Sequence, residues 1–324
     1  MGHGRYQALH GPGSRWYYDH AMTLRLIDGP ALRATLSMRA AVDALERALV
    51  DHPTPTGPVR SSVPAGRGEI LLMPASGAAA SGVKVIGLQP ENPARGLPFV
   101  QGIYVLFDTE TLTPRALIDA AELTRIRTAS ISALGARHLA RPESSTMVVF
   151  GTGVQAGAHV ESMRAVLPIA RVTIVGRRRE AAEALAAQLA GTGVEIAAGD
   201  AEAVREADVV CTCTSTTEAL FEDAWIRPGT HIAAIGSYLP ERREVPSATV
   251  ARARVAVDDV EAALAEAGDL LRAIDEGSFS VDGILTDLPG LVRGATVRTS
   301  PEDVTLFKAV GSAFEDLIVA SAVA

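Results

Sequence analysis

Residues 148–156 read Val148-Val149-Phe150-Gly151-Thr152-Gly153-Val154-Gln155-Ala156, an apolar run followed by two closely spaced glycines. The apolar run predicts a buried strand, and the residues from Gln155 onward predict a helix. The glycines between them permit a tight turn and let the backbone approach a pyrophosphate, while Ala156 lets helix and strand pack closely. The helix N-terminus adds amide donors and the positive end of its dipole. This pattern predicts a dinucleotide site formed by Gly151, Thr152, Gly153, Val154 and Gln155; the alternative is a glycine-rich turn that serves packing only.

Downstream of this turn, short apolar segments alternate with helical ones. Such a series, with strands apolar along their whole length, is typical of a parallel sheet covered by helices on both faces. We therefore expect an α/β fold with a Rossmann-type, doubly wound domain over residues 129–299. Its expected strands are 147–150, 171–175, 194–197, 208–212, 231–235 and 255–257, and its expected helices are 155–166, 180–189 and 202–206.

The residues before this series predict a different kind of domain. Short apolar runs bounded by glycine and proline indicate strands of an antiparallel or mixed sheet, and two longer periodic segments indicate helices. The strands are expected at 24–28, 70–73, 82–88 and 99–107, and the helices at 30–50 and 117–139. A final helix over 306–323 is expected to pack back on this α+β domain, which then comprises residues 22–128 and 300–324. Residues 1–21 show no periodicity and are interpreted as an N-terminal extension or, alternatively, an ordered arm.

The composition excludes several classes of function. The chain has 324 residues, a formal net charge of −8 and two cysteines. The negative charge argues against a nucleic-acid partner, and the absence of a disulfide framework favours a reducing cytoplasm. No apolar run reaches the roughly 18 residues of a membrane span, and no signal peptide is recognisable. His138, His159 and His231 have no partners at ligand spacing, so no metal is expected. We expect a cytoplasmic enzyme acting on a small molecule.

The end of the second expected Rossmann strand carries a basic turn. It reads Ile174-Val175-Gly176-Arg177-Arg178-Arg179, where an NAD-specific site would have an acidic residue for the ribose 2′-hydroxyl. Arg177 and Arg178 suit a 2′-phosphate instead. The turn therefore favours NADP(H) over NAD(H), with NAD(H) as the alternative; a solvated basic turn would look the same.

Several short motifs, taken together and in order, resemble the ornithine cyclodeaminase/mu-crystallin family. The resemblance runs from about residue 24 to the C-terminus. It implies a Rossmann domain, a substrate and dimerisation domain completed by the last helix, and a homodimer paired through that domain. It also implies amino-acid or imino-acid substrates and a bound nicotinamide. Besides the turn at 151–156, the motifs are Leu72-Met73-Pro74, Gly82-Val83-Lys84-Val85, Gly96-Leu97-Pro98-Phe99-Val100-Gln101-Gly102, Leu123-Thr124-Arg125-Ile126-Arg127-Thr128-Ala129, Glu266-Ala267-Gly268-Asp269-Leu270 and Glu302-Asp303-Val304-Thr305-Leu306-Phe307-Lys308.

A substrate of this class brings a carboxylate, which requires fixed cations. Lys84 interrupts an apolar strand, where a lone charge is costly unless it is paired or functional. Lys84 and Arg127 match the family's carboxylate-binding residues, and Arg60 matches a third basic position. The alternatives are a lysine at a sheet edge, a surface ion pair for Arg127 and a solvated loop charge for Arg60.

The resemblance also suggests neighbours for the cofactor. Thr128 and Gln155 are expected beside it by the same match. Thr212 and Thr214 follow the fourth Rossmann strand, where they would either face the nicotinamide ribose or belong to the core.

Two positions depart from the pattern of the ornithine cyclodeaminases. Leu71 stands where those enzymes carry a glutamate, and Tyr238 stands where they carry an aspartate. These acids would hold the distal amine of ornithine, whose charge would be costly to bury beside Leu71 and Tyr238. Ornithine cyclisation is therefore disfavoured, although Glu69 would point inward if its strand shifted register.

A carboxylate clamp beside a nicotinamide, without those acids, suits hydride transfer to a C=N bond next to a carboxylate. We expect an NAD(P)H-dependent reductase of imino acids, or the reverse amino-acid dehydrogenase, with Lys84, Arg127 and Tyr238 as catalytic residues and Arg60 and Leu71 lining the substrate site. Tyr238 either donates a proton or shapes the pocket. The alternative functions are a lyase with bound NAD and an NADPH-dependent binding protein of mu-crystallin type.

Overall fold

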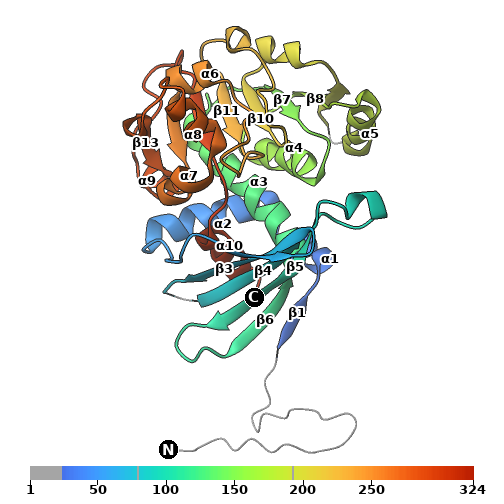
Figure 1. The fold of residues 1–324 in the computed structure, drawn as a ribbon, viewed down its shortest axis with the longest axis vertical. Coiled ribbons are helices and arrows are strands. Elements are labelled where there is room, and N and C mark those ends of the chain that lie inside the picture. The colour runs from blue at the N-terminus through green and yellow to red at the C-terminus, as the bar shows by residue number, and fades with distance from the viewer. Residues whose placement is uncertain (1–23, 79, 192) are drawn as a thin grey trace, which may run out of the picture.

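The computed structural model describes residues 24–78, 80–191 and 193–324. It has two sheets, one in each of two domains stacked along the long axis (Figure 1). The predicted extension over residues 1–21 lies outside the described residues. No helix in the described part of the chain combines the length and apolar character needed to span a bilayer.

The upper domain contains an eight-stranded parallel sheet with helices on both faces (Figure 1). Its strand order is β13-β12-β14-β11-β10-β7-β8-β9, so the winding reverses between β7 and β10. The strands are β7 (Thr146–Phe150), β8 (Arg171–Val175), β9 (Glu195–Ala198), β10 (Val209–Thr212), β11 (His231–Ala234), β12 (Arg254–Val257), β13 (Ile284–Asp287) and β14 (Thr305–Lys308). The helices are α4 (Val154–Val166), α5 (Arg179–Leu189), α6 (Ser247–Arg252), α7 (Val260–Glu266), α8 (Gly268–Asp275) and α9 (Leu288–Val292). The predicted Rossmann fold is confirmed.

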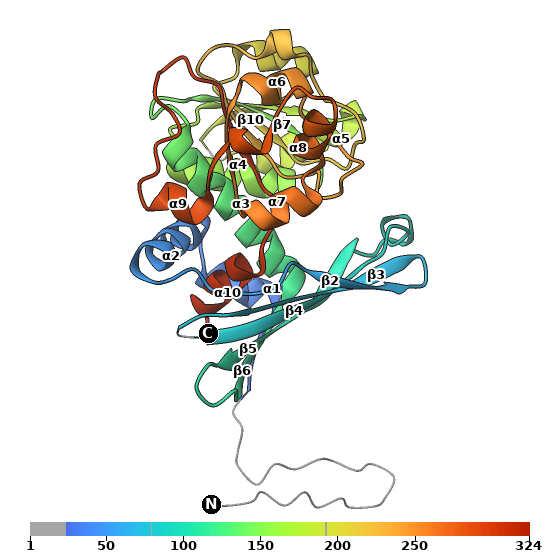
Figure 2. The same cartoon turned by 60° about the vertical axis from the view of Figure 1, so that its left-hand side comes forward.

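The lower domain has a six-stranded mixed sheet of order β1-β6-β5-β4-β3-β2, in which only the β1–β6 pair is parallel. Its strands are β1 (Arg25–Ile27), β2 (Ser61–Ala65), β3 (Gly68–Ser76), β4 (Ala80–Leu88), β5 (Val100–Asp108) and β6 (Pro114–Asp119). Its helices are α1 (Gly29–Thr35), α2 (Met38–Asp51), α3 (Ala120–Leu139) and α10 (Ala313–Ser321). These helices lie on the side of the sheet that faces the upper domain (Figure 2).

Three predicted helices differ from the structure. The helix expected over 117–139 begins only at Ala120, because residues 117–119 belong to β6. The helix expected over 30–50 is divided into α1 and α2, because Ser37 caps the amide of Ala40 at 3.2 Å and starts a new helix. The helix expected over 306–323 is wrong in its first part, where Thr305–Lys308 forms β14 between β11 and β12. All four residues of β14 are buried, so periodicity did not distinguish a central strand from a buried helix. The predicted boundary at residue 300 therefore places a strand of the upper sheet in the wrong domain.

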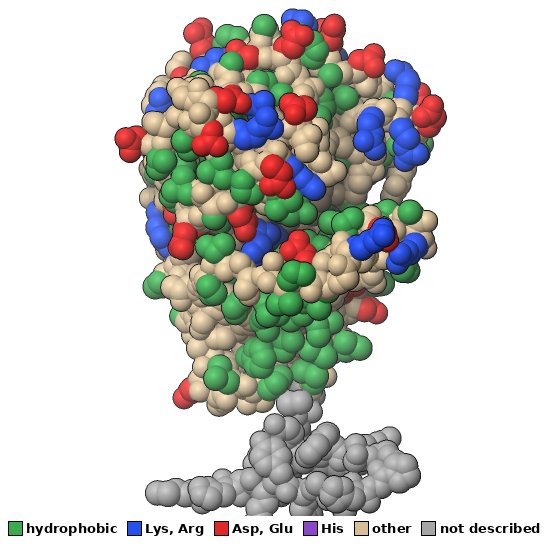
Figure 3. Space-filling view, viewed as in Figure 1, with side chains coloured by type: hydrophobic (Ala, Val, Ile, Leu, Met, Phe, Trp, Pro, Cys, Tyr) green, Lys and Arg blue, Asp and Glu red, His purple; other side chains and the backbone are tan. Residues whose placement is uncertain are grey.

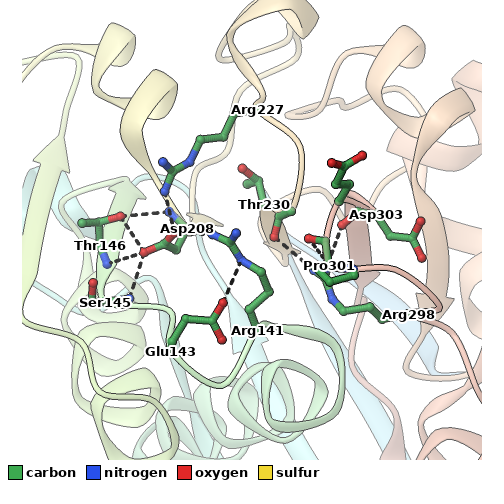
Figure 4. A network of polar contacts seen from close by, with 12 residues as sticks. Arg141, Glu143, Ser145, Thr146, Asp208, Arg227, Thr230, Arg298, Pro301 and Asp303 are labelled. Carbon is green, nitrogen blue, oxygen red and sulfur yellow. Dashed lines mark hydrogen bonds and ion pairs between the residues drawn. The ribbon is translucent and has the colours of Figure 1, made fainter.

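The N-terminal edge of the parallel sheet is held by one carboxylate (Figure 4). Asp208 accepts hydrogen bonds from the amides of Ser145 and Thr146 at 2.9 and 3.0 Å, and from Arg141 and Arg227 at 2.6 and 2.5 Å. Burial would raise the pKa of Asp208, but these donors lower it below its usual value. Because parallel strands share one direction, this structural network lies at the opposite edge from the strand ends that form the cofactor site.

The buried histidines serve the core, in line with the sequence-based interpretation. His159 contacts the Gln155 carbonyl at 2.8 Å and the Ser132 hydroxyl at 2.9 Å. His231 contacts the Thr305 hydroxyl at 3.0 Å. Burial lowers the pKa of His159 to about 4 and that of His231 to about 3, so both rings are neutral at physiological pH. Within the described ranges, no group of three His, Cys, Asp or Glu residues has metal-site geometry.

Candidate active site

The turn after β7 has the geometry of a dinucleotide cradle. Gly151 has φ +121°, and a β-carbon there would lie 2.6 Å from the Cys213 carbonyl oxygen, so only glycine fits. Gly153 caps α4 without a side-chain hydrogen bond, and a β-carbon there would meet nothing within 4 Å. Val154, the first residue of α4, is 69% exposed. The first amides of α4 therefore face open space at the point where the sheet reverses its winding, as a pyrophosphate requires.

The two predicted cofactor neighbours on α3 and α4 lie beside this turn. Gln155 donates to the carbonyl of Thr124 at 3.3 Å, which ties α4 to α3. Its other side-chain atom, Oε1, and the Thr124 hydroxyl have no hydrogen-bond partner in the described part of the chain. Thr128, one turn further along α3, is half-buried. Buried polar atoms without partners require an explanation, and a bound cofactor at this turn supplies one.

Thr212 and Thr214 both contact the buried carboxylate of Glu244. Thr212 is fully buried and donates its hydroxyl to Glu244 at 2.8 Å. Thr214 donates its hydroxyl and its amide to the same carboxylate, at 2.6 and 2.7 Å. Thr212 therefore belongs to the core, the second of its two predicted alternatives, whereas Thr214 is partly exposed and its cofactor contact stays a prediction.

Glu244 also holds the loop that carries Tyr238. It accepts from the amides of Gly236 and Ser237 at 2.8 and 3.2 Å. Lys308 donates to the Ser237 carbonyl at 2.5 Å and forms an ion pair with Asp269 at 3.0 Å, all within the buried core. Sequence reasoning missed this network, although Asp269 and Lys308 occur in two of the quoted motifs. It fixes the loops after β10 and β11 at the mouth of the cofactor site.

The basic turn after β8 is open to solvent. Arg177 and Arg178 are exposed and, among the described residues, have no ion-pair partner. Arg179 begins α5 and pairs with Glu183 at 3.1 Å and with Asp200 at 3.8 Å. The first two side chains therefore remain available to a ligand at the end of β8.

The two cations predicted to form a carboxylate clamp lie close together at the inner face of the lower sheet, where both contact Asp316. Lys84 lies on β4, a central strand between β3 and β5, so it is not a sheet-edge lysine. It is fully buried and forms an ion pair with Asp316 at 2.7 Å. Arg127 is 5% exposed and bonds Glu315 at 2.8 Å and Asp316 at 3.0 Å, so it is not a surface ion pair.

Both acids of this cluster come from α10, and the sequence interpretation missed them. Burial and then the charge of Arg127 lower the pKa of Lys84 to about 8, while Asp316 opposes that change. Burial raises the pKa of Glu315 to about 8 in spite of Arg127. The C-terminal helix thus supplies the acidic partners of both cations.

Arg60 joins the cluster from the loop before β2. Its guanidinium donates to the carbonyls of Val310 and Gly311 at 2.6 and 2.9 Å and pairs with Glu266 at 2.8 Å. Its side chain is 14% exposed, so it is not a solvated loop charge. Since Glu266 ends α7 of the upper domain, this ion pair bridges the two domains.

Leu71 and Glu69 face the same side of the sheet as the clamp. Met73 is the cross-strand neighbour of Lys84, and side chains alternate along β3, so residues 69, 71 and 73 share the inner face. Leu71 is 4% exposed. From the sequence, Glu69 was expected to point inward only if its strand shifted register. In the observed register Glu69 already faces inward, so that condition is corrected.

Tyr238 lies in the loop after β11, with the Arg242 guanidinium 5.8 Å from its ring centre. Burial raises the pKa of Tyr238, and Glu69 and Arg60 of the lower domain also act on it. Tyr238 therefore belongs to the region between the two domains.

A family comparison agrees with this arrangement. The model of the ornithine cyclodeaminase/mu-crystallin family matches residues 30–324. The chain belongs to this family.

Three similar proteins, each matched over most of its length, carry related activities in their names. A Delta(1)-pyrroline-2-carboxylate reductase of Bacillus cereus is 38% identical over 272 residues, which are 81% of this chain and 83% of that protein. The structure of the Thermococcus litoralis Delta(1)-pyrroline-2-carboxylate reductase, in complex with NADH and L-proline, has a TM-score of 0.87 at 30% identity, covering 92% of this chain and 96% of that one. An archaeal alanine dehydrogenase dimer with bound NAD has a TM-score of 0.87 at 29% identity, covering 93% and 94%.

Proposed function

We propose that the protein reduces a cyclic imino acid of the Delta(1)-pyrroline-2-carboxylate class to the corresponding amino acid with a reduced nicotinamide cofactor. The observation that carries the proposal is the pair of buried cations, Lys84 and Arg127, on the inner sheet face of a chain with a complete dinucleotide turn. Apolar Leu71 beside the clamp suits an uncharged ring. The named activity of the relatives at 38% and 30% identity supports the same substrate class.

The chain's residues have two tasks in this reaction. Lys84 and Arg127 hold the substrate carboxylate, the lysine as a point charge and the arginine as a fork, which fixes the adjacent C=N carbon. Leu71 and Met73 line the same face and exclude water. A reduced nicotinamide dinucleotide, with its pyrophosphate held at the Gly151–Gln155 turn, would supply the hydride that this carbon accepts.

The nitrogen of the C=N bond needs one proton before or during the transfer. Tyr238 carries its phenolic proton at neutral pH, and burial raises its pKa further from that range. It is the candidate donor, and shaping of the pocket is its alternative role. Tyr238→Phe separates the two: loss of a proton donor lowers kcat and changes its pH dependence, whereas a change of pocket shape acts mainly on KM.

We infer a preference for NADP(H) from the turn after β8. Arg177 and Arg178 lie at the end of β8, where a dinucleotide places its ribose 2′ position, and they have no ion-pair partner among the described residues. Both guanidinium groups are therefore free to bind a 2′-phosphate.

We also infer a homodimer formed through the outer face of the lower sheet. That face is not covered by any described helix (Figure 2), and hydrophobic side chains gather on the lower domain (Figure 3). Leu26, Val63, Ile70, Leu72 and Ile103 are between 37% and 80% exposed there. An apolar surface of this extent is typical of a protein interface, and a two-fold dimer would bury the same face of both copies. The related archaeal alanine dehydrogenase is a dimer.

The test is absorbance of the reduced nicotinamide with Delta(1)-pyrroline-2-carboxylate as substrate, with L-ornithine and NAD run in parallel and assayed for ammonia. Oxidation of NADPH or NADH with formation of proline supports the proposal. Ammonia release without net change in the cofactor would support a lyase instead. Cofactor binding without turnover of either substrate would support a binding protein.

A further inference from the structure

The carboxylate of Asp316 lies between the two cations of the clamp. One of its oxygens is 2.7 Å from Lys84 Nζ, and the other is 3.0 Å from Arg127 Nε. Asp316 is fully buried and lies in the first turn of α10, on a chain segment far from β4 and α3 in sequence. A single side chain of the C-terminal helix therefore sets the spacing of the two groups that would hold the substrate.

Lys84 depends on this carboxylate for its charge. Its cross-strand neighbours are Met73 and Tyr104, neither of which carries a negative charge at neutral pH. The charged groups that act on Lys84 are Arg127 from α3, Arg60 from the loop before β2 and Asp316 from α10. The two arginines disfavour the ammonium form, as does burial, so Asp316 is the group that opposes its deprotonation.

Glu315, the adjacent acid, has a different partner. It bonds Arg127 at 2.8 Å, and it is not among the main groups that act on Lys84. Glu315 is equally buried and lies in the first turn of the same helix. It therefore offers a matched control for the replacement of one buried acidic side chain of α10 by its amide.

We propose that Asp316 is the positioning residue of the clamp, which keeps Lys84 charged and holds it at a fixed distance from Arg127 for the substrate carboxylate. This inference rests on the proposed function, since it assigns Asp316 a part in binding the imino acid. It gives α10 a role in the reaction besides its packing against the sheet.

The first experiment compares the pH dependence of kcat/KM for Delta(1)-pyrroline-2-carboxylate in the wild type, Asp316→Asn and Glu315→Gln. Carboxylate binding requires the charged lysine, so kcat/KM falls on the alkaline side as Lys84 loses its proton. We expect this alkaline limb to move to lower pH by about one unit or more in Asp316→Asn, and to stay in place in Glu315→Gln. An unchanged limb in Asp316→Asn would overturn the proposal.

A substrate-free measurement separates this inference from the proposed function. The pKa of Lys84 is lower in the folded state than in the unfolded chain, so the unfolded state binds more protons between about pH 8 and 10.5 and stability rises with pH over that range. In Asp316→Asn the rise of Tm should begin at lower pH, whereas in Glu315→Gln it should begin where it does in the wild type. If the wild type reduces no imino acid, the proposed function fails and this comparison still decides whether Asp316 keeps Lys84 charged.

Asp316→Glu tests whether the position of the carboxylate relative to Lys84 and Arg127 matters. This test remains decisive if Asp316→Asn does not fold. It retains the charge but displaces the carboxylate by one methylene. We expect its alkaline limb to coincide with that of the wild type while KM rises about tenfold. Unchanged KM and kcat in a folded Asp316→Glu would contradict a positioning role.

Discussion

Gly311 leaves no room for a side chain above Arg127. A β-carbon at position 311 would fall on the Arg127 guanidinium, and the backbone there has φ +88°. The amide of Gly311 donates to Asp258 at 2.5 Å, and its carbonyl accepts from Arg60 at 2.9 Å. The link between β14 and α10 thus packs directly on the clamp. The Arg127 guanidinium is confined by the backbone at Gly311 as well as by the acids of α10.

Gly311→Ala is expected to impair substrate binding beyond its effect on stability. The matched control is Gly294→Ala, where φ is +101° and a β-carbon would meet nothing within 4 Å. Both variants incur the conformational cost of a left-handed alanine, roughly 1–2 kcal/mol. Only Gly311→Ala displaces Arg127, so only it should raise KM for the imino acid. Equal KM values in the two variants, measured by steady-state kinetics, would show that the Gly311 contact has no part in binding.

Removing one cation of the clamp should lower the activity and leave cofactor binding unchanged. Arg127→Met is expected to lower kcat/KM by roughly 30-fold to several thousand-fold, corresponding to about 2–5 kcal/mol for a buried charge contact. Arg125→Met is the control, because Arg125 lies on the same helix but pairs with Glu122 and Glu161. Retained NADPH binding, followed by fluorescence, verifies folding. A loss of the same size in both variants would argue against a specific clamp.

The proposed preference for NADP(H) can be tested by substituting the arginines that follow β8. The double variant Arg177→Ala, Arg178→Ala should raise the Kd for NADPH about tenfold or more, because charge-assisted hydrogen bonds to the 2′-phosphate are lost. The Kd for NADH should stay unchanged. Arg179→Ala is the control, since this arginine is already paired with Glu183 and Asp200. A parallel weakening of both cofactors in the double variant would refute the preference.

The dimer can be tested with one charge on the outer face of the lower sheet. Leu72→Glu places a carboxylate on the apolar outer face, where Leu72 is 37% exposed, and should halve the mass measured by light scattering. Leu285→Glu, at a 45% exposed leucine of the upper domain, should leave the mass unchanged. A monomeric wild type, or a dimeric Leu72→Glu protein, would exclude this interface.

The upper domain was largely predictable, because its strands are short, apolar and separated by helices with a clear period. β8 was predicted with its observed bounds, Arg171–Val175. β2 was missed because four of its five residues are exposed and Pro64 interrupts it, so it has no hydrophobic pattern. β14 was misassigned because its partners β11 and β12 precede it by many residues. The sequence of residues 305–308 does not by itself indicate that pairing.

The site was predictable where a charged residue interrupts an apolar segment. Lys84 gave that signal on β4, as did Arg127 on α3. Glu315 and Asp316 give the same signal, two acids in the apolar helix of residues 313–321, but it was not connected with the cations. Buried charges require partners, so an unmatched lysine and arginine in one part of a sequence predict acids in another. Glu244 carries no such signal, because its donors are backbone amides and threonine hydroxyls.

The most direct test of the account is the initial rate of NADPH oxidation with Delta(1)-pyrroline-2-carboxylate, measured for the wild type and for Lys84→Met. The account predicts stoichiometric formation of proline by the wild type and a loss of kcat/KM of at least roughly 30-fold in Lys84→Met, with NADPH binding retained. A wild type that does not oxidise NADPH or NADH with this substrate, or a Lys84→Met protein as active as the wild type, would contradict it.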